Sequence, residues 1–419
     1  MAAPLILGGR GEEEIGAGAA EIRRQAEEQA GVGQARRVAF VFSPLRSEYA
    51  GMGRDLPSHS AFEAQMQACE TALAPLLGWS LRDALEESPA APPLARLDVS
   101  QPLLFAIQVS LARFWSSLGV RPDAVLGHSV GEIAAAACCG ALSLGEAARA
   151  AATWGRCCRQ LEGEGAMASL PLDAEAVAQR ISRRRGRLAI AAVNSPSWTA
   201  VSGDREAIEE LLAELAGEGV HGRSMEVPAP GHSAGMEPVH KTFMHELAAL
   251  SPAQPSFPFY SSALGRRADP RALDATYWSA NLRRPVLFEA ALRALRKDGF
   301  DAFVEIGPRP VLAAAIEEIA AERSAAVDFS EVPEQETDDV LLDLVLVRAT
   351  AALGRVAPAT ADPDATFKDL GFDSAAAVAL RDVLNRLTGL RLHATVAFDH
   401  PTPRRLAAKL RDDLEAERA

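Results

Sequence analysis

The serine at position 129 lies in a pattern that prepares a serine hydroxyl for nucleophilic attack. Residues 125–136 read VLGHSVGEIAAA, so Ser129 stands between Gly127 and Gly131, after a short apolar run and before an alanine-rich helical stretch. Gly-x-Ser-x-Gly between a strand and a helix predicts a sharp turn that exposes the hydroxyl. Such a serine takes an acyl group from an ester or thioester and passes it to water or to a thiol. The motif also occurs by chance, and alone it does not separate a hydrolase from a transferase.

A second serine, Ser374, follows Gly371, Phe372 and Asp373 in the string FKDLGFDSAAAVALRDVLNRLTGLRLHATVAF at 367–398. Asp and Ser also occur simply as helix N-caps. The helix after Ser374 is expected to turn the following side chains toward a core: Val378, Leu380, Val383, Leu384 and Leu387. The whole string, continued by HATVAFDHPTPRRLAAKL, closely resembles acyl carrier protein domains of modular polyketide synthases. The resemblance implies that Ser374 carries a 4′-phosphopantetheine arm ending in a thiol, attached by a phosphopantetheinyl transferase.

Residues 37–322 resemble the acyltransferase domain of the same synthases, which is similar to malonyl-CoA:acyl carrier protein transacylases. The resemblance is carried by AGMGRDL at 50–56, QPLLFA at 101–106, GHSVGEIAAA at 127–136, VNSPSWTAVSG at 193–203, GHSAGMEP at 231–238, NLRRPVLF at 281–288 and FVEIGPRPVL at 303–312. With a thiol acceptor in the same chain, a transferase is favoured over a hydrolase.

Adjacent side chains on a sharp turn point apart, so His128 is not expected to act as the base of Ser129. The resemblance implies that His232, in GHSAGMEP, is the catalytic base. His232 would deprotonate Ser129, protonate the departing CoA sulfur and activate the carrier thiol. The family orients this histidine by a main-chain carbonyl, which we assign to Leu287. By their places in the shared motifs, Gln101 and Asn194 are expected to bind substrate.

An oxyanion hole needs two N–H donors, expected here from Val130 and Leu45. The family loop that supplies the second donor reads Phe-Pro-Gly-Gln-Gly-Ser-Gln, whereas residues 42–48 read FSPLRSE. Leu45 keeps its backbone N–H, but both glycines are gone. A misaimed donor costs about 3 kcal/mol, or two orders of magnitude in rate. An impaired or silent transferase therefore remains open at this point.

Position 154 indicates which acyl group is used. Malonyl-type transferases hold the free carboxylate with an arginine there, and this sequence has Trp154. Arg156 lies about 200° further around the helix and does not replace it. A buried carboxylate without its partner costs about 3 to 5 kcal/mol. Since loading acyltransferases share this replacement, we expect a monocarboxylic starter unit, although Trp154 as an ordinary core residue is the plainer alternative.

The residues before His232 also bear on the acyl group. The family's pocket residues are His-Ala-Phe-His in malonyl enzymes and Tyr-Ala-Ser-His in methylmalonyl enzymes, and here they are Ala229-Pro230-Gly231-His232. The small side chains of Ala229 and Gly231 predict a roomier pocket, suited to propionyl or branched short chains.

Strand, helix, strand, turn and helix follow one another through 37–140, which predicts a parallel sheet covered by helices. The order βαββαβ over 166–228 predicts an inserted ferredoxin-like subdomain. The expected fold is thus an α/β, parallel-sheet, hydrolase-like acyltransferase core with this subdomain, followed by an all-α carrier-protein helical bundle. The expected ranges are a leader or docking helix at 1–36, the acyltransferase at 37–322, a linker at 323–339 and the carrier at 340–412.

Composition narrows the other possibilities. The net charge of −13 argues against a nucleic-acid partner, and no apolar stretch is long enough for a membrane span. The five cysteines have no metal-ligand spacing, and we expect no metal and a reducing, cytoplasmic setting.

The resulting hypothesis is a polyketide starter-unit loading didomain that self-acylates from acyl-CoA and passes the acyl group to a downstream ketosynthase on another polypeptide. Malonyl-type extension, editing hydrolysis and a catalytically silent carrier or docking module are the alternatives.

Overall fold

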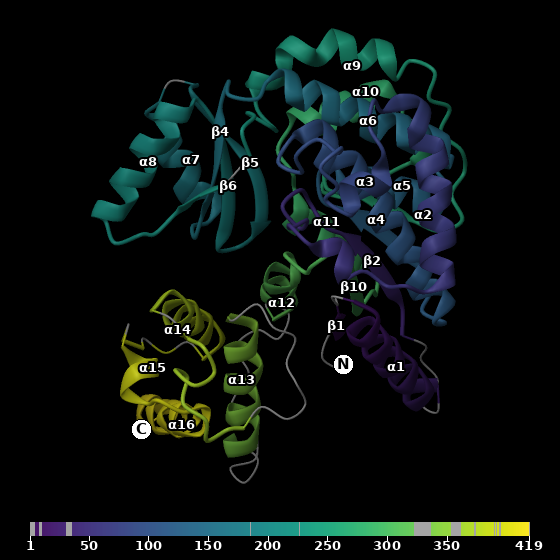
Figure 1. The fold of residues 1–419 in the computed structure, drawn as a ribbon. Helices are drawn as coiled ribbons and strands as arrows, with labels where there is room; N and C mark the ends of the chain where they lie inside the picture. Colours follow the sequence, from purple (N-terminus) through teal and green to yellow (C-terminus); the bar gives the residue numbers. More distant parts are fainter. Residues whose placement is uncertain are drawn as a thin grey trace. The chain divides into compact units, whose positions relative to one another are not determined.

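The computed structural model describes residues 5–7, 11–30, 36–184, 186–225, 227–321, 337–352, 362–372, 374–388, 390, 392–393 and 395–418. The chain divides into two compact units, residues 1–315 and 316–419, and each is described by itself. The first unit contains the α/β domain with its inserted subdomain, and the second is helical (Figure 1).

A six-stranded sheet forms the centre of the first unit. Its strands run in the order β1 (Leu5–Leu7), β10 (Ala302–Ile306), β2 (Val38–Phe42), β3 (Ala124–Gly127), β8 (Phe259–Ser261) and β9 (Arg266–Arg267). The first five strands are parallel and β9 is antiparallel. Strands β2, β3 and β10 are buried along their whole length, as expected for a parallel sheet with helices on both faces.

Nearly all side chains of α4 (Leu97–Ser117) are buried. This helix packs against α2 (Ser60–Leu73), α5 (Gly131–Cys139) and α6 (Leu144–Gln160). Three further helices come later in the chain: α9 (His240–Glu246), α10 (Ala275–Arg283) and α11 (Phe288–Lys297). All five cysteines are unbridged, and four of them are buried apolar fillers.

The N-terminal segment differs from the expectation of a separate leader. Residues 5–7 form β1, the edge strand beside β10, and α1 (Gly11–Ala30) buries Ile15, Ala19 and Ile22 in the main core. Arg23 on α1 donates to the carbonyl of Leu118 at the end of α4. The apolar face of α1 is thus covered by the acyltransferase core, and a leader or docking role of residues 1–36 stays a prediction.

The inserted subdomain has the predicted βαββαβ order. Strands β4 (Ala166–Leu170), β5 (Leu188–Ser195), β6 (Trp198–Gly203) and β7 (Arg223–Met225) form an antiparallel sheet in the order β5-β6-β4-β7. Helices α7 (Ala174–Ser182) and α8 (Arg205–Gly217) pack on one face of it, as Figure 1 shows. This is the ferredoxin-like arrangement that the sequence predicts.

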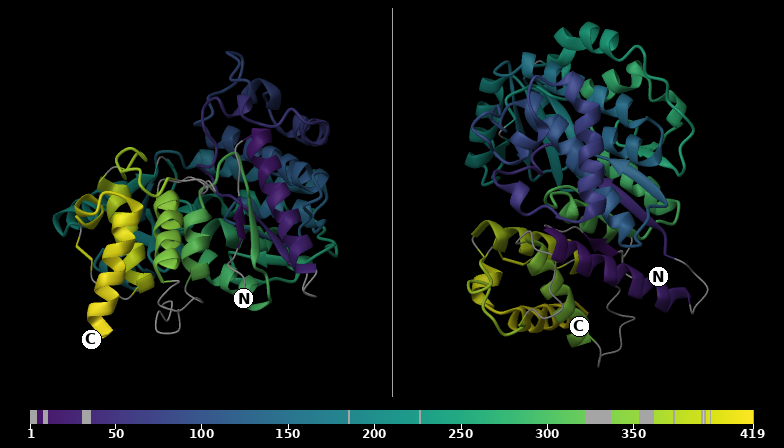
Figure 2. Two further views of the ribbon diagram at one scale, coloured as in Figure 1. Left: turned by 90° about the horizontal axis from the view of Figure 1, so that it is seen from below. Right: turned by 45° about the vertical axis from the view of Figure 1, so that its right-hand side comes forward.

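In the second unit the described elements are all helical: α13 (Thr337–Ala352), α14 (Ser374–Thr388), α15 (Val396–Asp399) and α16 (Pro403–Arg418), coloured green to yellow in Figure 2. Leu380 and Leu384 of α14 join the core as expected. Val378 does not, since it is 38 % exposed, and the side chain of Leu387 lies outside the described residues.

Domain boundaries near the junction are only partly covered by the described residues. Helix α12 (Ala313–Ala321) is followed by residues 322–336, which lie outside the description and contain most of the expected linker at 323–339. Helix α13 begins at Thr337, three residues before the expected start of the carrier at 340. In the described part of the chain, no helix is long and apolar enough to cross a membrane, and no group of three metal-ligand side chains gathers.

Candidate active site

The turn that carries Ser129 is formed between the end of β3 and the start of α5. Ser129 adopts a left-handed backbone with φ 56°, which is costly for any residue other than glycine. The flanking glycines explain how the turn closes. A Cβ on Gly127 would lie 2.2 Å from the Glu132 nitrogen, and one on Gly131 would lie 2.6 Å from the Phe42 carbonyl oxygen. The two glycines let the start of α5 approach both its own strand and the end of β2.

His232 lies beside this serine, although 103 residues separate them in the chain. Its Nε2 is 2.6 Å from the Ser129 Oγ, within hydrogen-bond range. His232 also has a left-handed backbone, with φ 57°, and its N–H donates to the Leu282 carbonyl at 3.1 Å. The structure thus brings together the two residues that the sequence analysis chose as nucleophile and base.

The carbonyl that orients His232 belongs to Arg284, and the assignment to Leu287 is wrong. Nδ1 of His232 lies 3.0 Å from the Arg284 oxygen. Helix α10 ends at Arg283, and Arg284 is extended, so its carbonyl is not used by the helix. The Leu287 carbonyl instead accepts the N–H of Ala291 in the first turn of α11.

The environment keeps the imidazole of His232 neutral. Burial lowers its pKa to about 4, while hydrogen bonds to the carbonyls of Arg284 and Asn281 oppose the shift. With Nδ1 donating to Arg284, Nε2 is the free acceptor for the serine proton. Burial likewise lowers the pKa of His128 to about 4, but its Nε2 pairs with Asn194 Oδ1 at 2.7 Å and not with Ser129.

The two expected oxyanion donors have backbone N–H groups with no acceptor among the described residues. Val130 is the N-cap of α5, and Leu45 lies in the loop after β2. That loop touches the nucleophile turn, because a Cβ on Gly131 would lie 2.7 Å from the Ser43 carbonyl oxygen. Both N–H groups are thus available for a developing negative charge, and their role stays a prediction.

The loop after β2, residues 42–48, has a left-handed backbone at one position although it contains no glycine. Arg46 stands at the position of the second family glycine and has φ 78°. Its N–H donates to Glu48 Oε2 at 2.7 Å, and its carbonyl accepts Arg309 Nη2 at 2.8 Å. A left-handed arginine costs about 1 to 2 kcal/mol, which these two bonds offset. Burial raises the pKa of Glu48, and its hydrogen bonds to backbone N–H groups act against that.

The start of the same loop is also fixed. Ser43 Oγ donates to Glu305 Oε1 at 2.8 Å, and the Ser43 carbonyl accepts Gln108 Nε2 at 2.7 Å. Glu305 further accepts the N–H groups of Val311 and Leu312, and burial raises its pKa to about 7. The loop is therefore held on both sides of Leu45.

Trp154 is buried at the active site. It is 3 % exposed, its ring centroid is 6.5 Å from that of His232, and its edge contacts Phe243 at 6.0 Å between centroids. Arg156 points elsewhere, as the helical geometry predicts: its guanidinium pairs with Glu246 and Thr153.

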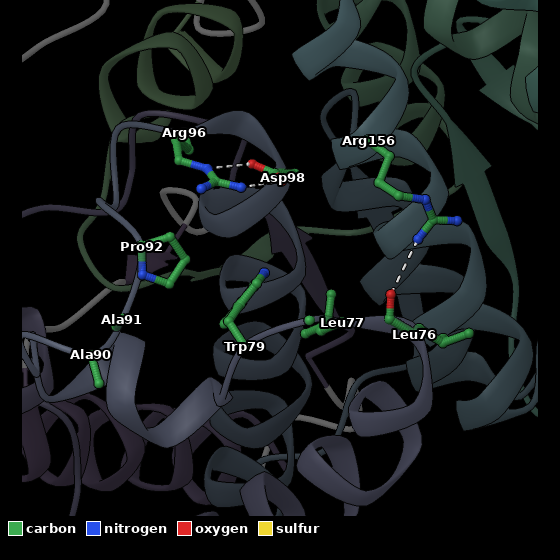
Figure 3. Close-up of a pocket in the computed structure, with 10 residues that line it drawn as sticks. Leu76, Leu77, Trp79, Ala90, Ala91, Pro92, Arg96, Asp98 and Arg156 are labelled. Atoms are coloured by element: carbon green, nitrogen blue, oxygen red, sulfur yellow. Dashed lines mark hydrogen bonds and ion pairs between the residues drawn. The ribbon is translucent and has the colours of Figure 1, made fainter.

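Arg156 lines a separate surface cavity of about 460 Å³. Figure 3 shows its guanidinium directed at the Leu76 carbonyl. Trp79 and the ion pair of Arg96 and Asp98 line the same cavity. Neither Ser129 nor His232 belongs to its walls, so this cavity is not the acyl site.

The other residues expected to bind substrate are buried or lie beside open space, and they have different neighbours. Asn194 is buried and its side chain is used by His128. Gln101 is buried with an unpaired Oε1 and lies near the Cys158 thiol on α6. Ala229 is 2 % exposed within the core that contains Trp154, and a Cβ on Gly231 would meet only Met167 Sδ, at 3.7 Å. Space therefore exists at position 231, while substrate contact by all four stays a prediction.

Ser374 is the first residue of α14. Gly371 before it is exposed, has φ 95° and would have open space around a Cβ. A serine at a helix N-terminus beside an open loop suits a phosphate ester, because the first helical N–H groups attract anions. The side chains of Ser374 and Ala375, and residue Asp373, lie outside the described residues.

Sequence reasoning missed four residues at the site: Glu132, Phe243, Asn281 and Arg284. Glu132 carried a readable signal, since it is the one charged residue in the apolar run after the nucleophile. Phe243, Asn281 and Arg284 lie at the site because of where helices end and how they pack, and the spacing of residues in the sequence does not predict either.

A parallel α/β sheet that presents a serine and a neutral histidine at a strand-to-helix turn defines the class of serine-dependent acyl-transfer enzymes. Comparison with known proteins specifies the family. The acyl transferase domain model matches residues 39–358, and the phosphopantetheine attachment site model matches residues 345–410. The chain belongs to the acyl transferase family, in the form found in type I polyketide synthases, and its acyl transferase domain is followed by a phosphopantetheine attachment site.

Several relatives resemble about two thirds of this chain. Polyketide synthase GfsA of Streptomyces halstedii is 45 % identical over 283 residues, 67 % of this chain and 4 % of the synthase. A loading acyltransferase of the avermectin modular polyketide synthase is 42 % identical with a TM-score of 0.66, over 68 % of this chain and 92 % of that one. The acyltransferase domain from module 8 of the salinomycin synthase is 40 % identical with the same TM-score, over 70 % of this chain and 73 % of that one. The chain spans only 4 to 8 % of the length of the first three curated relatives.

Proposed function

We propose that this chain loads a short monocarboxylic acyl group from CoA onto its own carrier domain, as the starter unit of a polyketide. Ser129 is the acylated nucleophile and His232 the general base and acid. The carrier then presents the acyl group to a ketosynthase. The 42 % identity to a loading acyltransferase agrees with this proposal, and the 40 % identity to a module 8 acyltransferase does not separate it from chain extension.

In the acylation step, the neutral Nε2 of His232 removes the Ser129 proton as Oγ attacks the thioester carbon. The N–H groups of Val130 and Leu45 stabilise the oxyanion, and His232 returns the proton to the departing sulfur of CoA. A phosphopantetheine bound at Ser374 supplies the thiol that accepts the acyl group. For the second step His232 serves again as base, now toward the attacking thiol.

The observation that carries the choice of acyl group is Trp154 beside His232. A malonyl carboxylate there would need a buried cation, since an unpaired buried charge costs about 3 to 5 kcal/mol. Among the described arginines and lysines, Arg36 alone is buried, and it pairs with Asp301. Arg156 is occupied by Glu246, and the side chain of Arg284 is exposed. These surroundings favour an acyl group without a second carboxylate.

Intact-protein mass spectrometry of the phosphopantetheinylated protein tests the proposal. The protein is incubated with acetyl-, propionyl-, isobutyryl- and malonyl-CoA in competition, and the experiment is repeated with Ser129→Ala. We expect a monocarboxylic acyl group on the Ser374 arm only when Ser129 is present. Preferential malonyl loading would identify an extender enzyme. CoA release without arm loading would identify an editing hydrolase, and no acylation at all a silent carrier module.

A further inference from the structure

Glu132 is a fully buried carboxylate three residues after the nucleophile, on the first turn of α5. Both of its oxygens are saturated by donors. Oε1 accepts Ser262 Oγ at 2.7 Å and the Ala263 N–H at 3.0 Å. Oε2 accepts Asn281 Nδ2 at 2.8 Å and the Tyr277 hydroxyl. A buried carboxylate with four hydrogen bonds is stable only because every donor is in place.

The donors come from the two segments that frame the nucleophile. Ser262 and Ala263 follow β8, and the Ser262 Oγ also accepts the N–H of Ser129, at 3.4 Å. The carboxylate is therefore joined to the nucleophile's own backbone through a single hydroxyl. Through this contact it fixes one side of the left-handed turn at Ser129.

Tyr277 and Asn281 both lie on α10, the helix whose C-terminal end holds the base. Next to Asn281, the Leu282 carbonyl accepts the His232 N–H, and two residues further the Arg284 carbonyl contacts His232 Nδ1. The Asn281 carbonyl is a further partner of the imidazole. A shift of α10 relative to α5 would consequently move three His232 contacts together.

We infer that Glu132 is the positioning residue that sets the distance between Ser129 and His232. It touches neither substrate nor reacting atoms, and acts by joining α5, which follows the nucleophile, to α10, which orients the base. A displacement of 1 Å between catalytic groups is enough to cost about 100-fold in rate. The inference rests on the proposed Ser129–His232 pair and adds the residue that aligns it.

An exchange of the interacting groups gives a direct test. Asn281→Asp alone places two carboxylates face to face, while Glu132→Gln with Asn281→Asp lets the new amide donate to the new carboxylate. The oxygen of the amide introduced at position 132 then still accepts from Ala263 and Ser262. The volumes are nearly unchanged in both variants, so the core packing is preserved.

The variants are compared by kcat and KM for CoA release from acyl-CoA, with free pantetheine as the thiol acceptor, and by thermal midpoint. We expect Asn281→Asp to lower kcat at least about 20-fold with KM within about twofold, and the double variant to recover to within about fivefold of the parent, because residues in one hydrogen-bond network couple strongly. Tyr260→Phe is the matched control: it removes a part-buried tyrosine hydroxyl that is bonded to Asp298 and not to Glu132, Ser129 or His232, and should lower only the thermal midpoint.

Two results would overturn the inference. One is a folded Asn281→Asp protein with kcat close to that of the parent. The other is a double variant that regains thermal stability without regaining kcat, which would show a purely structural network. Labelling of Ser129 by a fluorophosphonate, absent in Ser129→Ala, checks the catalytic pair separately. If the parent itself is not labelled, the proposed pair fails, whatever the role of Glu132.

Discussion

Ser129 and His232 meet at 2.6 Å, and both hold a left-handed backbone, with φ of 56° and 57°. Strained backbone of this kind persists only where the surroundings impose it, and it gathers at catalytic sites. Here the close approach of α5 to β2 and β3, which the two flanking glycines permit, imposes it on the serine, and the carbonyls at the end of α10 hold the histidine. The pair is thus prearranged for proton transfer before any substrate binds.

Removing the base should abolish turnover, whereas removing the side chain of its orienting residue should not. We expect His232→Ala to lower kcat/KM for acyl-CoA by about 10³-fold or more, as for other members of a serine–histidine unit. Arg284→Ala should stay within about threefold, because its main-chain carbonyl is what contacts His232. Steady-state CoA release measures both. A large loss in Arg284→Ala would show that its guanidinium takes part in binding or catalysis.

The acid limb of the pH–rate profile should lie unusually low. Only neutral His232 acts as a base, and its pKa is lowered from 6.5 to about 4 by burial. The rate of Ser129 acylation should therefore remain constant from neutral pH to about 5 and fall as pH passes through about 4. The unfolded chain takes up this proton near pH 6.5, so folding stability should decline as pH falls from 6.5 toward 4. Stopped-flow acylation across pH checks this, and an acid limb at 6.5 would contradict it.

The loop that carries Leu45 should depend on Glu48 more than on Arg46. Arg46→Gly relieves the left-handed backbone and should keep kcat within about threefold of the parent. Glu48→Ala removes the acceptor of the Arg46 N–H and should lower kcat by about 10- to 100-fold, because the Leu45 donor is misaimed. The pair is compared in single-turnover acylation. Equal rates in Glu48→Ala and the parent would show that Glu48 does not aim the Leu45 donor.

Acyl-chain length should respond to position 231. We expect the parent to use propionyl- and isobutyryl-CoA at rates comparable to acetyl-CoA, because only Met167 Sδ lies near a Cβ placed there. Gly231→Ala should lower the isobutyryl-to-acetyl ratio of kcat/KM by about 10-fold, the discrimination that one methylene-sized change gives. Competition kinetics measure the ratio. A parent that prefers acetyl-CoA by about tenfold over isobutyryl-CoA would refute the roomy pocket.

Much of the fold and the central pair could be predicted because the sequence carries them locally. The nucleophile turn, the βαββαβ subdomain and His232 all sit in contiguous motifs. The carbonyl that orients His232 was assigned to Leu287 and belongs to Arg284. A shift of three positions along the chain decides whether a carbonyl lies at the end of α10 or in the first turn of α11. Element boundaries are the least certain part of a sequence-based prediction. The burial of α1 and the exposure of Val378 likewise depend on packing between distant segments.

The claim that Trp154 selects a monocarboxylic acyl group is tested most directly by kcat/KM for propionyl-CoA relative to malonyl-CoA, measured in the parent and in Trp154→Arg. Trp154→Phe serves as the control for lost ring volume. We predict a ratio of at least about 100 in the parent and in Trp154→Phe, and a fall of about 100-fold in Trp154→Arg, as expected when a buried carboxylate gains its partner. A parent that uses malonyl-CoA as well as propionyl-CoA would contradict the loading function proposed for this chain.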